Sequence, residues 1–224
     1  MLTSKEKIMK RRIYLLMPKV LLIALLATTA LFGQYKLEST GAPPDELAPA
    51  VKEALQASGA KIVGADGSAL CEIWFRKSLP SGPASTEQGV SLNTVPHGTM
   101  LGVIRFPKRG QDRRGLTIPE GVYTLRYSLF PPDGNHQGVA AQRDFLLLVP
   151  AAGDTDLNST PSFKEVVAMS AKTTGGSHPA SLSLWKDEAG HEPGLAQEGE
   201  SDWVLHTKIG DTAIGLIVVG VFQG

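Results

Sequence analysis

The sequence contains a single cysteine, Cys71, which excludes an intrachain disulfide and requires the fold to be held by packing. It lies in the segment ALCEIWFRK, where Cys71, Ile73 and Phe75 share one face of a predicted strand. An unpaired cysteine in such a strand behaves as a small buried hydrophobe. A catalytic thiolate, the alternative, would need a histidine or a cation from far along the chain.

Several motifs of catalytic chains are absent. There is no phosphate-binding glycine loop, dinucleotide fingerprint, G-x-S-x-G elbow or H-E-x-x-H pair. The five histidines stand alone, so a metal site would have to be assembled across loops. Blue copper is disfavoured because its cysteine and histidine ligands come from neighbouring loop positions, and no histidine neighbours Cys71. We therefore expect no resident cofactor, with a metal ion as the alternative.

The net charge is zero, but its distribution is uneven. Of the 22 basic residues six precede Gln34, against one of the 22 acidic residues, which leaves 16 basic and 21 acidic residues in the remainder. An acidic remainder argues against nucleic acid as a partner, because phosphate neutralisation needs a basic face. A basic cluster at residues 105–114 could hold an anion or a lipid headgroup, although such runs are usually solvated loops.

The N-terminal basic residues precede an uncharged run, VLLIALLATTALF, at residues 20–32. This is the arrangement of a secretory signal peptide, which we place at residues 1–33. Counted from Ile13, the apolar stretch approaches the length of a membrane span, so an uncleaved anchor is the alternative. We expect an exported chain, periplasmic or extracellular, that meets a membrane only if this segment is retained.

After a linker at residues 34–44, the patterns predict one domain over residues 45–224. Helices are expected at residues 45–58 and 163–172, the second with a capping box formed by Ser162 and Glu165. Asp66 and Gly67 predict a hairpin turn, and residues 123–130 alternate as a half-buried strand. Further short strands, ending with the apolar TAIGLIVVGVFQ, predict a mainly β fold: an antiparallel β-sandwich, immunoglobulin-like or prealbumin-like, with two short peripheral helices.

The order GTMLGVIRF, IPEGVYTLRY, DGNHQGV and RDFLLLVPA, within residues 61–151, resembles an uncharacterised family of exported bacterial β-sandwich proteins. The piece IPEGVYTL is also similar to the turn and strand of many secreted immunoglobulin-like and prealbumin-like modules. The resemblance implies a fold and an exported location. It implies no activity.

The candidate ligand-binding residues lie in a long loop. If residues 123–130 and 143–149 pair as a hairpin, the connection at residues 131–142 exceeds ordinary hairpin loops, and such loops concentrate binding residues. Its candidates are Asp133, Asn135 and His136, although Pro-Pro-Asp-Gly also forms a purely structural turn. The main hypothesis is a non-enzymatic module that binds a protein partner or a small molecule through end loops.

The alternative hypothesis is a metal-dependent or hydrolytic enzyme. Its site would gather His97, Asp133, His136 and His178, with the three histidines as metal ligands. The acidic stretch at residues 186–202 could bind calcium, but it lacks the spacing of a calcium loop, which favours a solvated linker.

Three residues are expected to be structural: Cys71, Asp144 and Arg126. Asp144 shares a strand face with leucines, so its carboxylate needs a cation or several donors. Arg126 is the nearest candidate in sequence, and backbone amides of the loop at residues 131–142 are the other expected donors.

Overall fold

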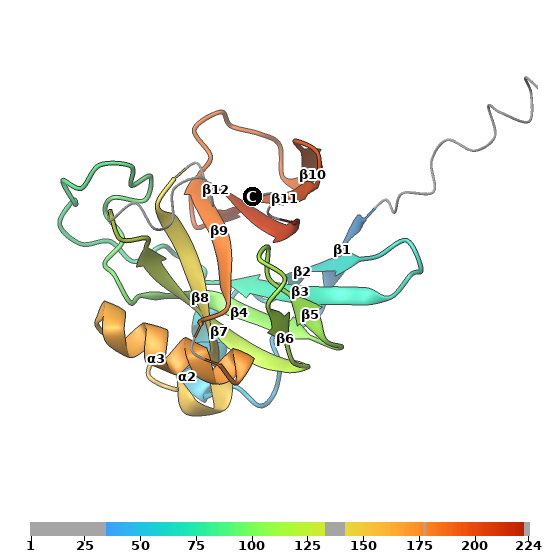
Figure 1. Cartoon of the computed structure of the whole chain (residues 1–224), viewed down its shortest axis with the longest axis horizontal. Helices are drawn as coiled ribbons and strands as arrows, with labels where there is room; N and C mark the ends of the chain where they lie inside the picture. Colours follow the sequence, from blue (N-terminus) through green and yellow to red (C-terminus); the bar gives the residue numbers. More distant parts are fainter. Residues whose placement is uncertain (1–34, 133–141, 177, 222–224) are drawn as a thin grey trace, which may run out of the picture. The chain divides into compact units, whose positions relative to one another are not determined.

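In the part of the chain that the structure describes, residues 35–132, 142–176 and 178–221, ten strands form one antiparallel sheet (Figure 1). The structure is a computed structural model. The strand order is β1-β2-β3-β4-β7-β8-β9-β12-β11-β10. The bounds are β1 (Lys36–Thr40), β2 (Gly59–Val63), β3 (Ala69–Phe75), β4 (Met100–Phe106), β7 (Gly121–Leu129), β8 (Asp144–Pro150), β9 (Ser181–Lys186), β10 (Gly194–Glu198), β11 (Asp202–Ile209) and β12 (Thr212–Val219). The remaining described elements are the ribbon of β5 (Gly110–Gln111) and β6 (Thr117–Ile118), α2 (Pro49–Ala54), α3 (Phe163–Thr174) and the 3-10 turn η1 (Ala151–Gly153).

The sheet curls around a large hydrophobic core until it is nearly barrel-shaped. The core takes residues from β2 to β12, for example Ile62, Leu125 and Leu216. The two edge strands of the sheet, β1 and β10, contact one another, and next to them Tyr35 meets Trp203 of β11 edge-on with ring centroids 5.3 Å apart. The mainly β, antiparallel fold with two helices is therefore confirmed.

The two helices cover the outer side of β3, β4, β7 and β8 (Figure 1). Val51 of α2 packs with Trp74, and Val166 of α3 packs with Leu147. The prediction that β7 is half-buried was wrong, since Arg126 on its outer face is fully buried as well.

Local sequence signals account for both helix boundaries. In α3 the backbone amide and the hydroxyl of Ser162 both donate to the Glu165 carboxylate, which confirms the capping box, and Gly175 ends the helix at a φ of 66°. The helix α2 is shorter than predicted. It begins at Pro49, which fits the first turn because a proline needs no amide partner there, and Leu55 is already extended.

The sequence predicted strands correctly in the middle of the sheet but missed the two strands at its edges. The hairpin at Asp66 and Gly67 is confirmed, with Gly67 at a φ of 77°, and β12 lies in the interior of the sheet as predicted. The expected linker at residues 34–44 instead contains β1, and the expected solvated linker at residues 186–202 contains β10. Both are edge strands with mostly exposed or half-exposed residues.

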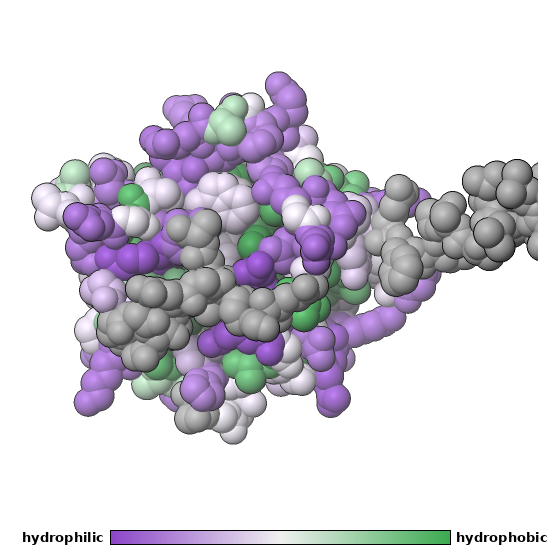
Figure 2. Space-filling model, turned by 45° about the horizontal axis from the view of Figure 1, so that its top comes forward, coloured by the Kyte–Doolittle hydropathy of each residue, from purple (hydrophilic) through white to green (hydrophobic). Residues whose placement is uncertain are grey.

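Large apolar side chains are rare on the described surface. Figure 2 shows a mostly hydrophilic face with small apolar areas. Exposed large hydrophobic residues are Leu37, Phe163 and Val221. Among the described residues, no helix combines the length and the apolar character needed to cross a membrane.

Candidate functional site

A groove of about 320 Å³ opens where the first strands of the sheet face β11. The residues that line it are Leu37, Glu38, Ser39, Gln56, Ser58, Gly59, Ala60, Ile73, Phe75 and Thr207. Ile73 and Phe75 lie buried beneath it in the main core, and the apolar surface that the groove exposes comes from residues such as Leu37, which is 38% exposed. Most of the remaining lining is polar. This combination suits a small amphipathic molecule.

A glycine is required beside this groove by the close approach of β2 and β3. Gly59 cannot carry a side chain without strain, because a Cβ there would lie 2.4 Å from the carbonyl oxygen of Ile73. Thr207 shares a face of β11 with the core residues Leu205 and Ile209, so it is directed to the inner side of the sheet. The side-chain amide of Gln56 spans the gap and donates to the Lys208 carbonyl at 3.1 Å.

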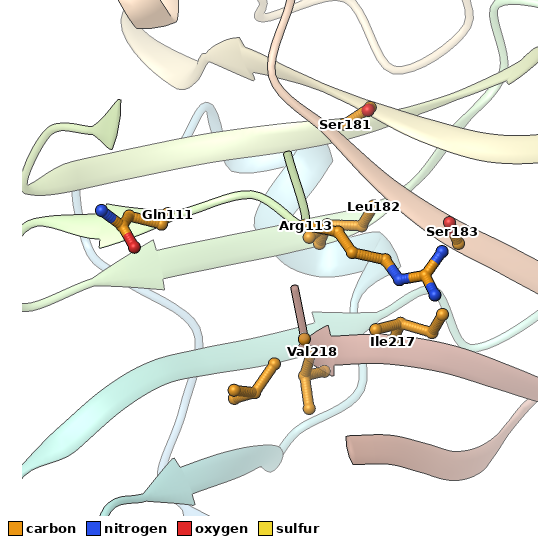
Figure 3. A pocket seen from close by; sticks show the side chains of 9 residues that line it. Gln111, Arg113, Ser181, Leu182, Ser183, Ile217 and Val218 are labelled. Carbon is orange, nitrogen blue, oxygen red and sulfur yellow. The ribbon is translucent and has the colours of Figure 1, made fainter. Parts of the chain in front are cut away.

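A second cavity, near β9 and β12, is too small for a ligand (Figure 3). Its volume is about 10 Å³, close to the space of a single water molecule. Arg113 lies along it and pairs with Asp202 through its Nε and Nη2 atoms at 3.0 and 2.7 Å. Two other members of the basic cluster are also paired, Arg105 with Glu72 and Arg114 with Asp112, which argues against an anion site there.

The loop residues predicted to bind a ligand, Asp133, Asn135 and His136, lie outside the described residues. His97 is half-buried, with its Nε2 atom 2.9 Å from the hydroxyl of Ser128, and burial lowers the pKa of its imidazole. His178 is exposed, and its carbonyl accepts a hydrogen bond from Thr174. Within the described residues, neither His97 nor His178 belongs to a group of three or more potential metal ligands.

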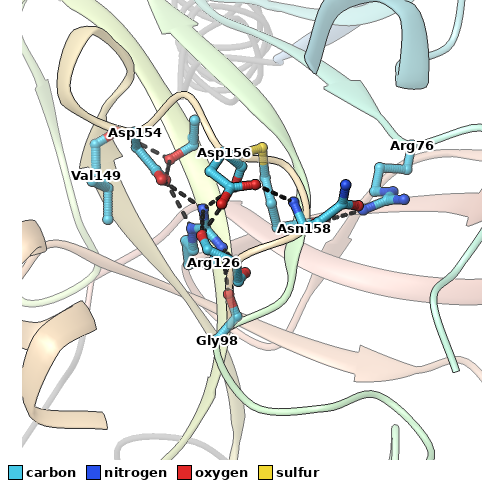
Figure 4. A network of polar contacts seen from close by, with 10 residues as sticks. Arg76, Gly98, Arg126, Val149, Asp154, Asp156 and Asn158 are labelled. Carbon is cyan, nitrogen blue, oxygen red and sulfur yellow. Dashed lines mark hydrogen bonds and ion pairs between the residues drawn. The ribbon is translucent and has the colours of Figure 1, made fainter. Parts of the chain in front are cut away.

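We expected Arg126 to pair with Asp144. It pairs instead with Asp154, in the turn after β8 (Figure 4). Its Nε and Nη2 atoms donate to the two carboxylate oxygens of Asp154 at 2.8 and 2.5 Å. The remaining donors reach three backbone carbonyls, those of Gly98, Asp156 and Ser159. A fully satisfied network of this kind is structural.

Asp144 receives donors from a segment that the sequence analysis did not name. Its carboxylate accepts the backbone amides of Ser91 and Leu92 at 2.8 and 2.9 Å, together with the hydroxyl of Tyr127 at 2.7 Å. Burial and the Asp144 charge raise the pKa of Tyr127. Asp144 thus fixes the segment that joins β3 to β4. Residues 133–141 of the loop that was predicted to supply donors lie outside the described residues.

Cys71 is buried in the main core, at 2% exposure. Burial and the nearby Glu72 charge raise the pKa of its thiol to about 12. A nucleophilic thiolate is therefore strongly disfavoured, and the buried position agrees with the strand face predicted for it.

A cluster that the sequence analysis did not predict lies just after β9. Nδ1 of His191 is 2.9 Å from Oδ1 and 3.0 Å from Oδ2 of Asp187, and Nδ1 of His206 is 3.1 Å from the same Oδ2. One donor atom from each of these residues lies within 4.8 Å of the other two. The one available signal was the spacing of Asp187 and His191, four residues apart, and it could not locate His206.

The local fold brings these residues together in two steps. The amide of Asp187 donates to the Ala213 carbonyl, which extends the pairing of β9 with β12 by one residue. Gly190, at a φ of 68°, then lets the chain turn back so that the amide of His191 donates to Asp187 at 3.1 Å. His206 comes from the outer face of β11, opposite the face of Leu205.

Comparisons with known proteins add no relative. No family model matches the sequence, and neither a curated protein nor a solved structure matches it. The resemblance to exported bacterial proteins therefore stays a prediction.

Proposed function

We propose that this chain is an exported, non-enzymatic binding module that holds a small amphipathic molecule in the groove between β1, β2 and β11. In this proposal the two halves of the curled sheet act as the layers of a β-sandwich. The observation that carries the proposal is the groove itself, with about 320 Å³ of space. This volume falls at the lower end of the range for small-molecule sites, about 300–1,000 Å³.

The lining also supports the proposal. Leu37 and Ala60 supply apolar surface, and the side chains of Ser39, Gln56 and Thr207 supply hydrogen-bonding groups near it. Glu38 also lines the groove, where its carboxylate pairs with Lys61.

The experiment measures binding of the neutral dye Nile red to the purified full chain by fluorescence. Thr207→Trp places a large side chain in the groove, and we expect it to weaken dye binding at least tenfold. Thr212→Trp is the matched control, since Thr212 begins the neighbouring strand and does not line the groove. Tryptophan is well tolerated in strands, so both variants should fold.

Unchanged dye binding by Thr207→Trp would contradict the proposal, as would equal losses in both variants. Dye that stays unbound to the wild-type chain would also contradict it.

A further inference from the structure

His206 is held by carboxylates at both ring nitrogens. It is 3% exposed, with Nδ1 3.1 Å from Asp187 and Nε2 2.7 Å from Glu198. Because an ionised carboxylate can only accept, Nε2 is the donor to Glu198, and Nδ1 is the ring nitrogen that faces Asp187. A carboxylate that accepts the far N–H of a histidine is the usual support of a metal-binding imidazole.

The strand register explains how Glu198 reaches His206. His206 pairs directly with Gly194, and residues 194, 196 and 198 share one face of β10. Gly194 has no side chain and Ala196 has only a methyl group, so this face of β10 carries no large side chain before Glu198.

The Asp187 carboxylate is crowded by donors. Besides the amide of His191, the Nδ1 atoms of His191 and His206 both converge on it. A cation among the three residues would be held by this carboxylate and by one nitrogen of each imidazole.

The cluster is accessible and close to ligand geometry. The side chain of His191 is 52% exposed, whereas those of Asp187 and His206 are 2% and 3% exposed, so one side opens to solvent. In a tetrahedral zinc site with ligands about 2.1 Å from the ion, donor atoms stand about 3.4 Å apart. The two Nδ1 atoms lie 2.9 to 3.1 Å from the Asp187 oxygens, a few tenths of an ångström below this value, and the three donor atoms all lie within 4.8 Å of one another. The exposed His191 can move to complete the geometry.

We propose that Asp187, His191 and His206 bind a divalent transition-metal ion, best matched by zinc, with Glu198 supporting His206. Two imidazoles and a carboxylate suit zinc and its neighbours. Calcium, which we considered for this stretch, prefers an all-oxygen shell and fits poorly. Three protein ligands leave a further coordination position for water or a small ligand. This site is separate from the groove, and neither proposal depends on the other.

The test titrates Zn²⁺ into the metal-stripped full chain, without a histidine tag, by calorimetry, and adds Co²⁺ to read the coordination from visible absorption. We expect one ion per chain, held by imidazole and carboxylate. His191→Ala should weaken zinc binding at least about 100-fold, beyond the 10–100-fold typical of losing a supporting residue. His178→Ala is the matched control, an exposed histidine outside the cluster, and should bind like the wild type.

A second variant tests the supporting residue. Glu198→Gln keeps an acceptor for the N–H of His206 but removes the charge, so zinc affinity should fall roughly tenfold. Since Glu198 is half-exposed, the urea midpoint of this variant should stay close to that of the wild type.

Three outcomes would overturn the proposal. They are a wild-type chain that does not bind zinc, equal zinc affinities of His191→Ala and His178→Ala, and displacement of zinc by an equal concentration of Ca²⁺. The first or the second would identify the cluster as a purely structural set of hydrogen bonds.

Discussion

The guanidinium of Arg126 and the carboxylate of Asp154 form a two-point ion pair that is almost completely hidden from solvent, with the side chains 0% and 3% exposed. Asp154 also accepts the hydroxyl of Thr124. This pair ties the turn after β8 to the outer face of β7. The pair lies on the outer face of β7, which the sequence had predicted to be exposed to solvent.

Asp154→Asn should therefore destabilise the fold strongly. The change leaves a buried guanidinium without its counter-ion, which typically costs about 3–5 kcal/mol. Urea unfolding measures the loss. Glu38→Gln, which breaks the exposed pair with Lys61, is the control and should cost less than about 1 kcal/mol. Similar losses in the two variants would contradict a structural role for the Arg126 network.

Asp144→Ala should destabilise the fold by about 1–3 kcal/mol, because two backbone amides and a tyrosine hydroxyl lose their acceptor. Tyr127→Phe removes only one of these bonds and should cost about 1 kcal/mol. The urea midpoints of both variants check this order. A midpoint unchanged in Asp144→Ala would show that the carboxylate does not hold the segment between β3 and β4.

Cys71 should resist thiol reagents in the native chain and react quickly in urea, since its side chain is buried and its pKa is raised to about 12. Cys71→Ala should cost on the order of 1 kcal/mol through lost packing. Labelling rates in native buffer and in urea, measured together, test the buried assignment. Equal rates in the two conditions would contradict it.

Residues 1–40 should export a fused reporter protein, and N-terminal sequencing should find a mature chain that starts between Leu31 and Tyr35. Retention of the reporter in the cytoplasm would contradict export. Recovery of Met1 or Met17 on membrane-bound protein would instead identify the segment as an anchor.

The sequence predicted those parts of the fold that depend on near neighbours. The capping box of α3 and the turn at Gly67 each need only a few adjacent residues. The strands β1 and β10 were missed because they lie at the edges of the sheet, where mostly exposed side chains give no hydrophobic alternation.

The sites depended on contacts that no local pattern encodes. Arg126 finds its partner 28 residues away in a turn, and Asp144 finds amides more than 50 residues away. His206 joins Asp187 only through the register of β9, β12 and β11. A search for histidine spacing along the chain therefore could not find the cluster.

The position of β12 has a consequence for the order in which the chain can fold. Although it follows β9, β10 and β11 in the sequence, it lies between β9 and β11 and pairs with both. While the ribosome is still synthesising residues 212–219, the hairpin of β10 and β11 has no place to join the rest of the sheet. A nascent chain must therefore expose an unpaired edge of β9 until residues 212–219 have been made, and during that time a chaperone would have this strand edge to bind.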